Sequence, residues 1–282
     1  MGKIIIKSML ACGTVFLCIV CFVNISRQKY FFQEKENYQV ICGMEQFVYS
    51  DLASDGEIRE FMEGCYFIEE DQQVEGIVHR TAAVTVVGEN IDSDILFPSF
   101  NRLAHDDLSG CLLDADTLYE LFGTANTLGQ VVVYDGREYR VRGVVDVELP
   151  LMVVSSEFAD DQRVDGLVLN TTGEWYRNQY ADLLNSVYGS TGRSYYLTDY
   201  VSAAKWIETP SKWSDFAFWS SYSDELKTRL EHVFFDNKDI TEQICLRKSF
   251  QIAGLRTALA LLAAGLFFGL FKLLIKERKA AG

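Results

Sequence analysis

The side chains with the clearest capacity for metal chemistry are two histidines and the acids near them. His79 and His105 could share a metal ion with Asp94, Asp106 or Asp107, since imidazole nitrogens and carboxylate oxygens are common ligands. The two histidines lack the i, i+4 spacing on a helix that dedicated zinc sites use. The sequence therefore predicts no metal site and no cofactor.

The hydroxyl-bearing residues also lack a catalytic setting. The chain contains no Gly-x-Ser-x-Gly elbow for a nucleophilic serine, and no Gly-x-x-x-x-Gly-Lys-Ser/Thr loop for a nucleotide. The acidic runs at 69–71 and 160–161 are typical of solvated loops. We therefore expect no catalytic residues, no enzyme activity, and no ATP-driven transport by this chain alone.

The seven cysteines divide by location. Cys12, Cys18 and Cys21 lie in an apolar stretch, where a thiol behaves mostly as a small hydrophobe even at the spacing Cys18-x-x-Cys21. Four others lie in the middle of the chain: Cys42, Cys65, Cys111 and Cys245. These four could form two disulfides in any of three pairings, and the sequence does not decide whether they do.

Two apolar stretches are long enough to cross a membrane. The first runs from Ser8 to Val23, is extended by 4–6, and approaches the roughly 20 residues that a bilayer requires. No small-x-small cleavage site follows it, which favours a retained anchor over a signal peptide. The second runs over 257–275. The sequence thus predicts transmembrane helices at 1–24 and 257–276.

Basic residues flank both stretches on one side. Lys3 and Lys7 precede the first stretch, and a cluster lies at the end of the second: Lys272, Lys276, Arg278 and Lys279. By the positive-inside rule, both termini then lie in the cytoplasm, including the tail at 277–282, and residues 30–250 lie outside the membrane. The net charge is −14, and an acidic domain repels nucleic acid, so we exclude nucleic-acid binding.

The middle of the chain holds a short helix signal. Leu118, Leu121 and Phe122 recur at helical spacing, and Gly123 can adopt the left-handed conformation that ends a helix. Asp114 or Asp116 can cap the first turn. We expect this helix to pack under the hairpin that follows it.

The hairpin is indicated by Asp-Gly between two β-rich runs, 130–134 and 137–145. Both central residues of a type I′ turn have positive φ, which Asp135 and Gly136 tolerate. Tyr139, Val141 and Gly143 then alternate with arginines, so one face of the second strand is expected to be buried.

Taken together, three features resemble the extracytoplasmic core domain of MacB-like ABC transporter permeases. They are Leu121-Phe122-Gly123, the step Leu128-Gly129-Gln130 and the strand from Tyr139 through Gly143. The resemblance implies an α+β fold with two lobes between the two membrane helices. A membrane-proximal lobe would comprise about 30–75 and 165–250, and an inserted lobe about 76–164. Asn101-Arg102 stands where the family has Gly-Arg.

The remaining patterns predict strands at 38–42, 166–170 and 193–197, a β-rich stretch at 74–87 and a polar loop at 88–94. They also predict helices at 56–64, at 176–187 and from Ser223. Trp206, Trp213 and Trp219 form an aromatic tract that could pack in the core, lie at the membrane interface or bind a partner.

Family permeases continue into further membrane helices and couple to an ATPase, whereas this sequence ends shortly after its second apolar stretch. We therefore expect an accessory or scaffold membrane subunit of an ABC-type export or cell-envelope machine, whose partners are a permease and an ATPase. Gly265 and Gly269 form a small-xxx-small pair for helix contacts in the bilayer. The alternative is a membrane-tethered sensor or binding module without a transporter.

Overall fold

The computed structural model describes residues 2–30, 32–33, 35, 37–77, 79–99, 101–124, 127–170, 193–197 and 239–281. The chain divides into two compact units. One, the helical unit, comprises 1–33 and 246–282, and the other, the sheet domain, comprises 34–245. We describe each by itself.

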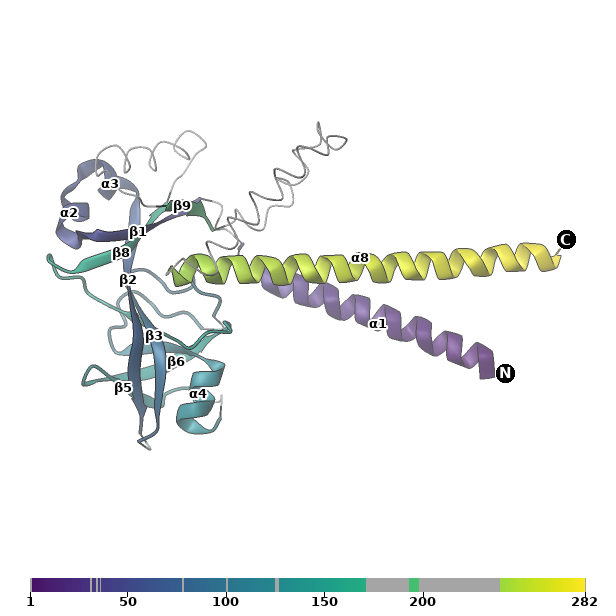
Figure 1. Cartoon of the computed structure of the whole chain (residues 1–282), viewed down its shortest axis with the longest axis horizontal. Helices are drawn as coiled ribbons and strands as arrows, with labels where there is room; N and C mark the ends of the chain where they lie inside the picture. Colours follow the sequence, from purple (N-terminus) through teal and green to yellow (C-terminus); the bar gives the residue numbers. More distant parts are fainter. Residues whose placement is uncertain are drawn as a thin grey trace. The chain divides into compact units, whose positions relative to one another are not determined.

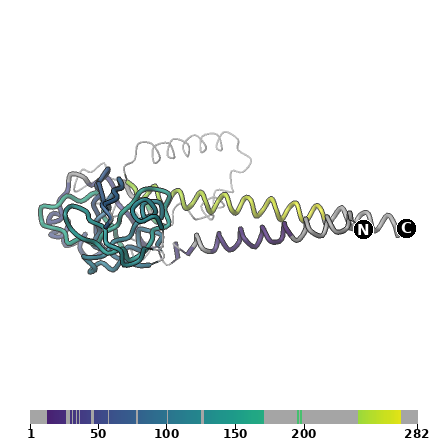
Figure 2. The backbone as a smooth tube through the Cα atoms, turned by 90° about the horizontal axis from the view of Figure 1, so that it is seen from below, coloured from purple at the N-terminus to yellow at the C-terminus, as the bar shows by residue number. Residues whose placement is uncertain are grey.

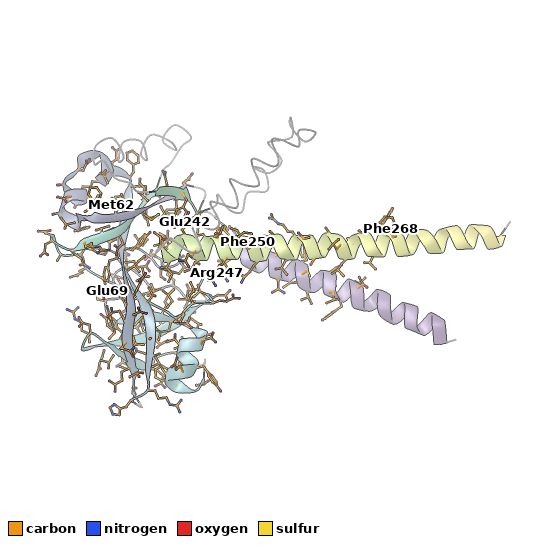
Figure 3. All side chains as sticks on the ribbon, in the orientation of Figure 1. Met62, Glu69, Glu242, Arg247, Phe250 and Phe268 are labelled. Atoms are coloured by element: carbon orange, nitrogen blue, oxygen red, sulfur yellow. The ribbon has the colours of Figure 1, made fainter. Side chains whose placement is uncertain are left out.

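The helical unit contains the two long helices traced in Figure 2: α1 (Gly2–Tyr30) and most of α8 (Ile240–Ala281). Within α8, the stretch Ile240–Gly269 is long and apolar enough to cross a bilayer by length and composition, and α1 holds a shorter apolar stretch, Gly13–Ser26. Large apolar side chains are exposed on both helices, among them Phe16 on α1 and Phe268, which Figure 3 labels on α8. The prediction of two membrane-spanning helices is therefore supported at α8 and stays a prediction at α1.

The sheet domain consists of nine described strands and three short helices. In chain order they are β1 (Tyr38–Val48), α2 (Tyr49–Ser54), α3 (Gly56–Phe61), β2 (Met62–Gly76), β3 (Thr81–Glu89), β4 (Gly110–Asp114), α4 (Ala115–Phe122), β5 (Val131–Tyr134), β6 (Arg137–Val145), β7 (Leu151–Ser155), β8 (Arg163–Asn170) and β9 (Arg193–Tyr196). Figure 1 labels most of them. The mixture of a sheet with separate short helices makes the fold α+β, as the sequence predicted.

Six of the strands close on themselves. The order is β3-β7-β4-β6-β5-β2, and β3 pairs with β2 as well as with β7, so the ladder returns to its start as a small barrel. Closure leaves no edge strand in this part of the sheet. The pairs β3–β7 and β4–β6 are parallel, and the others in the ring are antiparallel.

The long strand β2 belongs to two parts of the sheet. Beyond β2 the order continues β8-β1-β9, so β2 pairs with β8 near its start and with β3 and β5 further along. The register against β3 shifts between Glu69 and Gln72, and Asp71 there has a positive φ of 54°. A bulge of this kind bends a strand and increases its local twist, which lets one strand serve two differently oriented sheets.

Two separate apolar clusters lie among the described residues of the sheet domain. One lies inside the barrel and includes Leu118 and Leu121 of α4 beside Val132 and Val141 of the β5–β6 hairpin. The other lies between α2, α3 and the strands β1, β2 and β8, with Leu52 at its centre. The barrel and the β2-β8-β1 part of the sheet therefore each pack around a core of their own.

Several predicted elements are confirmed and two boundaries are wrong. The strands at 38–42, 166–170 and 193–197 lie in β1, β8 and β9. The helix predicted over 56–64 ends at Phe61, because the residues from Met62 onward pair with β8. The loop predicted over 88–94 begins two residues later, since Gly88 and Glu89 still pair with β7. The helices predicted at 176–187 and from Ser223, and all three tryptophans of the aromatic tract, lie outside the described residues.

Candidate coupling site at the start of helix α8

The first turn of α8 is capped by a buried carboxylate. Asp239 precedes the helix, and its Oδ1 accepts hydrogen bonds from the backbone N–H of Thr241 at 2.9 Å and of Glu242 at 3.0 Å. The same oxygen accepts the Thr241 hydroxyl at 2.6 Å. The first N–H groups of a helix have no partner within the helix, so a carboxylate here satisfies them and interacts favourably with the helix dipole.

Two tyrosines connect this cap to the sheet. Tyr66 on β2 donates its hydroxyl to the other oxygen of Asp239, Oδ2, at 2.5 Å. The hydroxyl of Tyr195 on β9 lies 2.6 Å from Oγ1 of Thr241. Because the single hydroxyl proton of Thr241 already goes to Asp239, Tyr195 must be the donor in this contact. We call Asp239, Thr241, Tyr66 and Tyr195 the helix anchor.

The helix anchor is shielded from water. Tyr66 and Thr241 are fully buried, Tyr195 is nearly so, and Asp239 is 6% exposed. Burial raises the pKa of both tyrosines well above the ordinary value, and the nearby Asp239 carboxylate raises it further. Both hydroxyls therefore remain protonated and able to donate. A buried polar network in which each member is satisfied fixes one geometry, because any displacement leaves a buried polar group unpaired.

A glycine on the neighbouring strand provides the space for the Tyr66 ring. Gly166 of β8 lies opposite Tyr66 in the ladder. A Cβ at Gly166 would lie 2.1 Å from Cζ of that ring, which no real contact allows. The ring thus passes directly over the backbone of β8 to reach Asp239, and Gly166 is part of the site although it contributes no side chain.

The cap of α4 resembles the cap of α8 in chemistry. Asp114, and not Asp116, is the capping residue: its Oδ1 accepts from the N–H groups of Asp116 and Thr117 at 3.0 and 2.9 Å. Its Oδ2 accepts from the N–H of Leu151 on β7 at 2.8 Å. α4 ends at Gly123, whose φ is 73°, as the sequence predicted.

The predicted motif residues lie together around α4 and the hairpin. Leu121 and Tyr139 belong to the barrel core, while Phe122 only packs against it and is partly exposed. The ring of Phe122 lies beside Gly76, the last residue of β2: a Cβ on that glycine would lie 3.3 Å from the ring.

The turn glycines of the motif have the expected conformations. The hairpin turn has positive φ at Asp135 and Gly136, 48° and 72°. Gly129 has a φ of 83° and donates to the carbonyl of Val141, whereas Gly143 lies tightly against Asn101. A functional role for these residues stays a prediction.

The two histidines contact acids other than those that the sequence suggested. The ring of His79 lies 2.5 Å from Glu75, and the ring of His105 lies 3.2 Å from Asp92. In the part of the chain that the structure describes, no group of three or more potential ligands is placed to hold a metal ion.

The four cysteines of the sheet domain are buried and none of them is bridged to another. Burial raises the pKa of Cys65 and of Cys111 to about 12. A thiol that stays protonated is a poor nucleophile and metal ligand, so both act as packing residues.

Sequence reasoning missed the helix anchor. The pattern Asp239-Ile-Thr241-Glu242 directly before an apolar helix is a start signal that could have been found. No sequence signal links it to Tyr66 and Tyr195, which lie far away in the chain. The predicted interaction residues on α8, Gly265 and Gly269, face open space within the chain.

Comparisons with solved structures identify the class of domain that this chain is similar to. It is similar to the periplasmic region of MacB from Actinobacillus actinomycetemcomitans, with 14% identity and a TM-score of 0.43 over 59% of this chain and 94% of that one. It is also similar to the extracellular domain of YknZ, a noncanonic ABC-type transporter from Gram-positive bacteria, with 16% identity and a TM-score of 0.39 over 57% and 99%.

A domain of a permease-type protein from Porphyromonas gingivalis is a third such structure, with 9% identity and a TM-score of 0.37 over 55% of this chain and 84% of that one. No protein-family model and no curated protein sequence matches the chain. The similarity is therefore one of structure, to extracytoplasmic domains of the MacB type.

Proposed function

We propose that this chain is an accessory or scaffold membrane subunit of an ABC-type export or cell-envelope machine. It would transmit movements between its membrane helices and its sheet domain, which lies outside the cytoplasmic membrane. The observation that carries the proposal is the helix anchor, which fixes the first turn of α8 to β2 through the Asp239 carboxylate and to β9 through the Thr241 hydroxyl.

The chemistry of the helix anchor suits mechanical coupling better than catalysis or binding. Its donors are all directed at groups of the same chain, and its carboxylate is satisfied on both oxygens. A displacement of the first turn of α8 would have to break buried hydrogen bonds or move β2 with it. β2 in turn pairs with β8 and with two strands of the barrel, so it would carry the movement into both parts of the sheet.

The topology on which this mechanism depends is tested first. We expect both termini in the cytoplasm and the hairpin turn at Asp135 and Gly136 outside. Reporter fusions at residue 282, and labelling of an Asp135→Cys variant with a membrane-impermeant thiol reagent in intact cells, should report opposite sides. The native cysteines of the sheet domain are buried and serve as the unlabelled background. Labelling of both positions from the same side would contradict the proposal.

Association is tested on the full chain in native membranes. A tagged chain should co-purify in mild detergent with a permease and an ATPase, and replacing Gly265 and Gly269 with Leu should weaken this association without preventing insertion. A chain that inserts normally and recovers no nucleotide-hydrolysing partner would favour a membrane-tethered binding module.

Coupling is tested with the same complex. A fluorophore on Asp135→Cys should change its emission when ATP is added, because the barrel moves with α8. Tyr66→Phe removes one hydroxyl of the helix anchor and should reduce the response while the complex stays assembled. Tyr134→Phe is the matched control, since it removes a hydroxyl that also bonds a carboxylate on β2, that of Glu69, but takes no part in the helix anchor. Equal responses in both variants would exclude the helix anchor as the coupling element.

A further inference from the structure

A buried acid in the sheet domain has no hydrogen-bond partner. Glu89 is the last residue of β3 and is 1% exposed, and neither of its carboxylate oxygens has a hydrogen bond within the described part of the chain. An ionised carboxylate in such a place is strongly disfavoured, because it has lost its hydration and gained no donor in exchange. The ground state of this side chain is therefore the neutral acid.

A buried lysine lies within electrostatic reach of the same acid. Lys35 is 9% exposed, and its Nζ donates to the backbone carbonyl oxygens of Asp94 and, at 3.0 Å, of Ile95. Those carbonyls belong to the loop that directly follows β3. Lys35 itself follows α1 by five residues, so this ammonium ties the segment after the first long helix to the end of the barrel strand.

Three charged groups in the described part of the chain affect the ionisation of Glu89. Asp94 and Asp92 oppose its ionisation, and Lys35 favours it. Asp92 is itself held by Arg102 and by the ring and N–H of His105. The strands paired with β3 at this end contribute Tyr66 from β2 and Ser155 from β7 opposite Glu89. Burial away from water is the main cause that keeps the pKa of Glu89 well above the ordinary value.

We propose that Glu89 and Lys35 form a proton-operated latch between the segment that follows α1 and the barrel. With Glu89 neutral, the Lys35 ammonium stays on the carbonyl oxygens of Asp94 and Ile95. When Glu89 releases its proton to solvent, the new carboxylate attracts the same ammonium, which leaves one or both carbonyls to pair with it. The loop at Asp94 and Ile95 is then released.

The direction of the pH effect follows from the two buried groups. Glu89 has a higher pKa folded than unfolded, so the folded state loses stability as the pH rises from the unfolded pKa, about 4.5, toward the folded one. Lys35 has its pKa lowered to about 8 by burial, so its own effect lies above that pH, where stability increases as the pH rises.

Asp92 and Asp107 have lowered pKa values, so they affect stability only as the pH falls below their unfolded value of 3.8. Between the unfolded pKa of Glu89, about 4.5, and the lowered pKa of Lys35, about 8, Glu89 is the group of this cluster whose ionisation changes stability.

The test uses the full chain in detergent. We expect its melting temperature to fall by on the order of 5 °C between about pH 5 and about pH 7.5, and we expect Glu89→Gln to be nearly flat over that range. Glu69→Gln is the control, because it neutralises a more exposed acid of β2 and should leave the slope unchanged. A His105→Gln background removes the imidazole that contacts Asp92 beside Glu89.

A second measurement does not depend on the stability of a variant. The infrared carbonyl band of a neutral carboxylic acid should be present in the wild-type chain at neutral pH and disappear as Glu89 ionises. In Lys35→Met the band should persist to higher pH, since the charge that favours ionisation is gone. A wild-type chain without the band, or a Lys35→Met chain with an unchanged midpoint, would overturn the latch, as would an unchanged slope in Glu89→Gln.

Discussion

Two regions of the molecule attach a helix to the sheet: the α4–hairpin region, residues 114–145, and the helix anchor. Both begin a helix with an aspartate that also bonds to a strand: Asp114 holds α4 against β7, and Asp239 holds α8 against β2. In the first case the helix, the turn and both hairpin strands lie within about thirty residues. In the second the partners Asp239 and Tyr66 are separated by 173 positions.

The difference in sequence separation shows which part of the fold is determined by neighbouring residues and which part forms only when the whole domain has folded. The α4–hairpin region is held by apolar contacts in the barrel core, so it tolerates small errors of geometry. The helix anchor is held by short hydrogen bonds between buried groups, where loss of one partner leaves another unsatisfied. We therefore expect losses at the α4–hairpin region to be local and additive, and losses at the helix anchor to be coupled.

The largest loss of stability is expected at Gly166, where the Tyr66 ring leaves no space for a side chain. Gly166→Val would place a branched side chain within the Tyr66 ring and should destabilise the sheet domain by more than about 3 kcal/mol. Urea denaturation of the detergent-solubilised chain, followed by circular dichroism, measures this. Gly56→Ala is the control, because a Cβ there meets nothing within 4 Å, and it should change stability by less than about 0.5 kcal/mol. If Gly166→Val lowers the free energy of unfolding only slightly, Tyr66 can move away from Asp239 with little loss of stability.

The next largest effect separates two neighbours in the α4–hairpin region. Leu121 is fully buried, so Leu121→Ala should cost about 3 kcal/mol. Phe122 is only partly buried, and Phe122→Ala should cost less, about 1–2 kcal/mol, because part of its ring is already in water. The same denaturation experiment compares the two. The reverse order would mean that the ring of Phe122, and not Leu121, fills the end of the barrel.

Much of the α4–hairpin region could be predicted from sequence because its signals are adjacent in the chain. A capping aspartate, apolar residues at helical spacing and a glycine with φ of 73° define α4, and Asp135-Gly136 defines the turn. Helical spacing shows that Leu118, Leu121 and Phe122 share a face, but it does not show that Phe122 stays partly exposed while Leu121 is fully buried.

Barrel closure and the two buried polar sites could not be predicted in this way. The pairing of β3 with β7 joins 85–89 to 151–155 in parallel, and nothing within either strand specifies its partner. Glu89 was assigned to a polar loop because charged residues are usually exposed, yet β7 and β2 enclose it on both sides. Tyr66 and Asp239 carry no mutual signal in sequence, since their contact exists only once both are folded.

Coupling within the helix anchor is tested by a double-mutant cycle. Asp239→Ala removes the cap of α8 and leaves the Tyr66 hydroxyl with only a longer contact, 3.3 Å, to Oγ1 of Thr241, and should cost about 2–3 kcal/mol. Tyr66→Phe alone should cost about 1 kcal/mol, and the double variant less than the sum of the two. In the α4–hairpin region the corresponding pair, Asp114→Ala with Leu121→Ala, should be close to additive. Additivity at Asp239 and Tyr66 would mean that the two regions do not differ in the way we describe.

The smallest effect is expected at the hairpin turn, where only backbone conformation is at stake. Gly136 has a φ of 72° and open space around it, so Gly136→Ala meets no clash, and its cost comes from holding a residue with a Cβ at positive φ. A left-handed conformation costs a residue with a Cβ about 1–2 kcal/mol, and the less flexible unfolded chain offsets about 0.4–1 kcal/mol of this. The net loss should therefore be about 1 kcal/mol or less, and Gly136→Val should lose more, because a branched Cβ resists positive φ. Asp135→Gly, which relieves the other positive φ, should lose little or nothing. If Gly136→Ala lowered stability as much as Leu121→Ala, the turn would make contacts that its open surroundings do not show. The α4–hairpin region would then depend on contacts with the rest of the domain, as the helix anchor does.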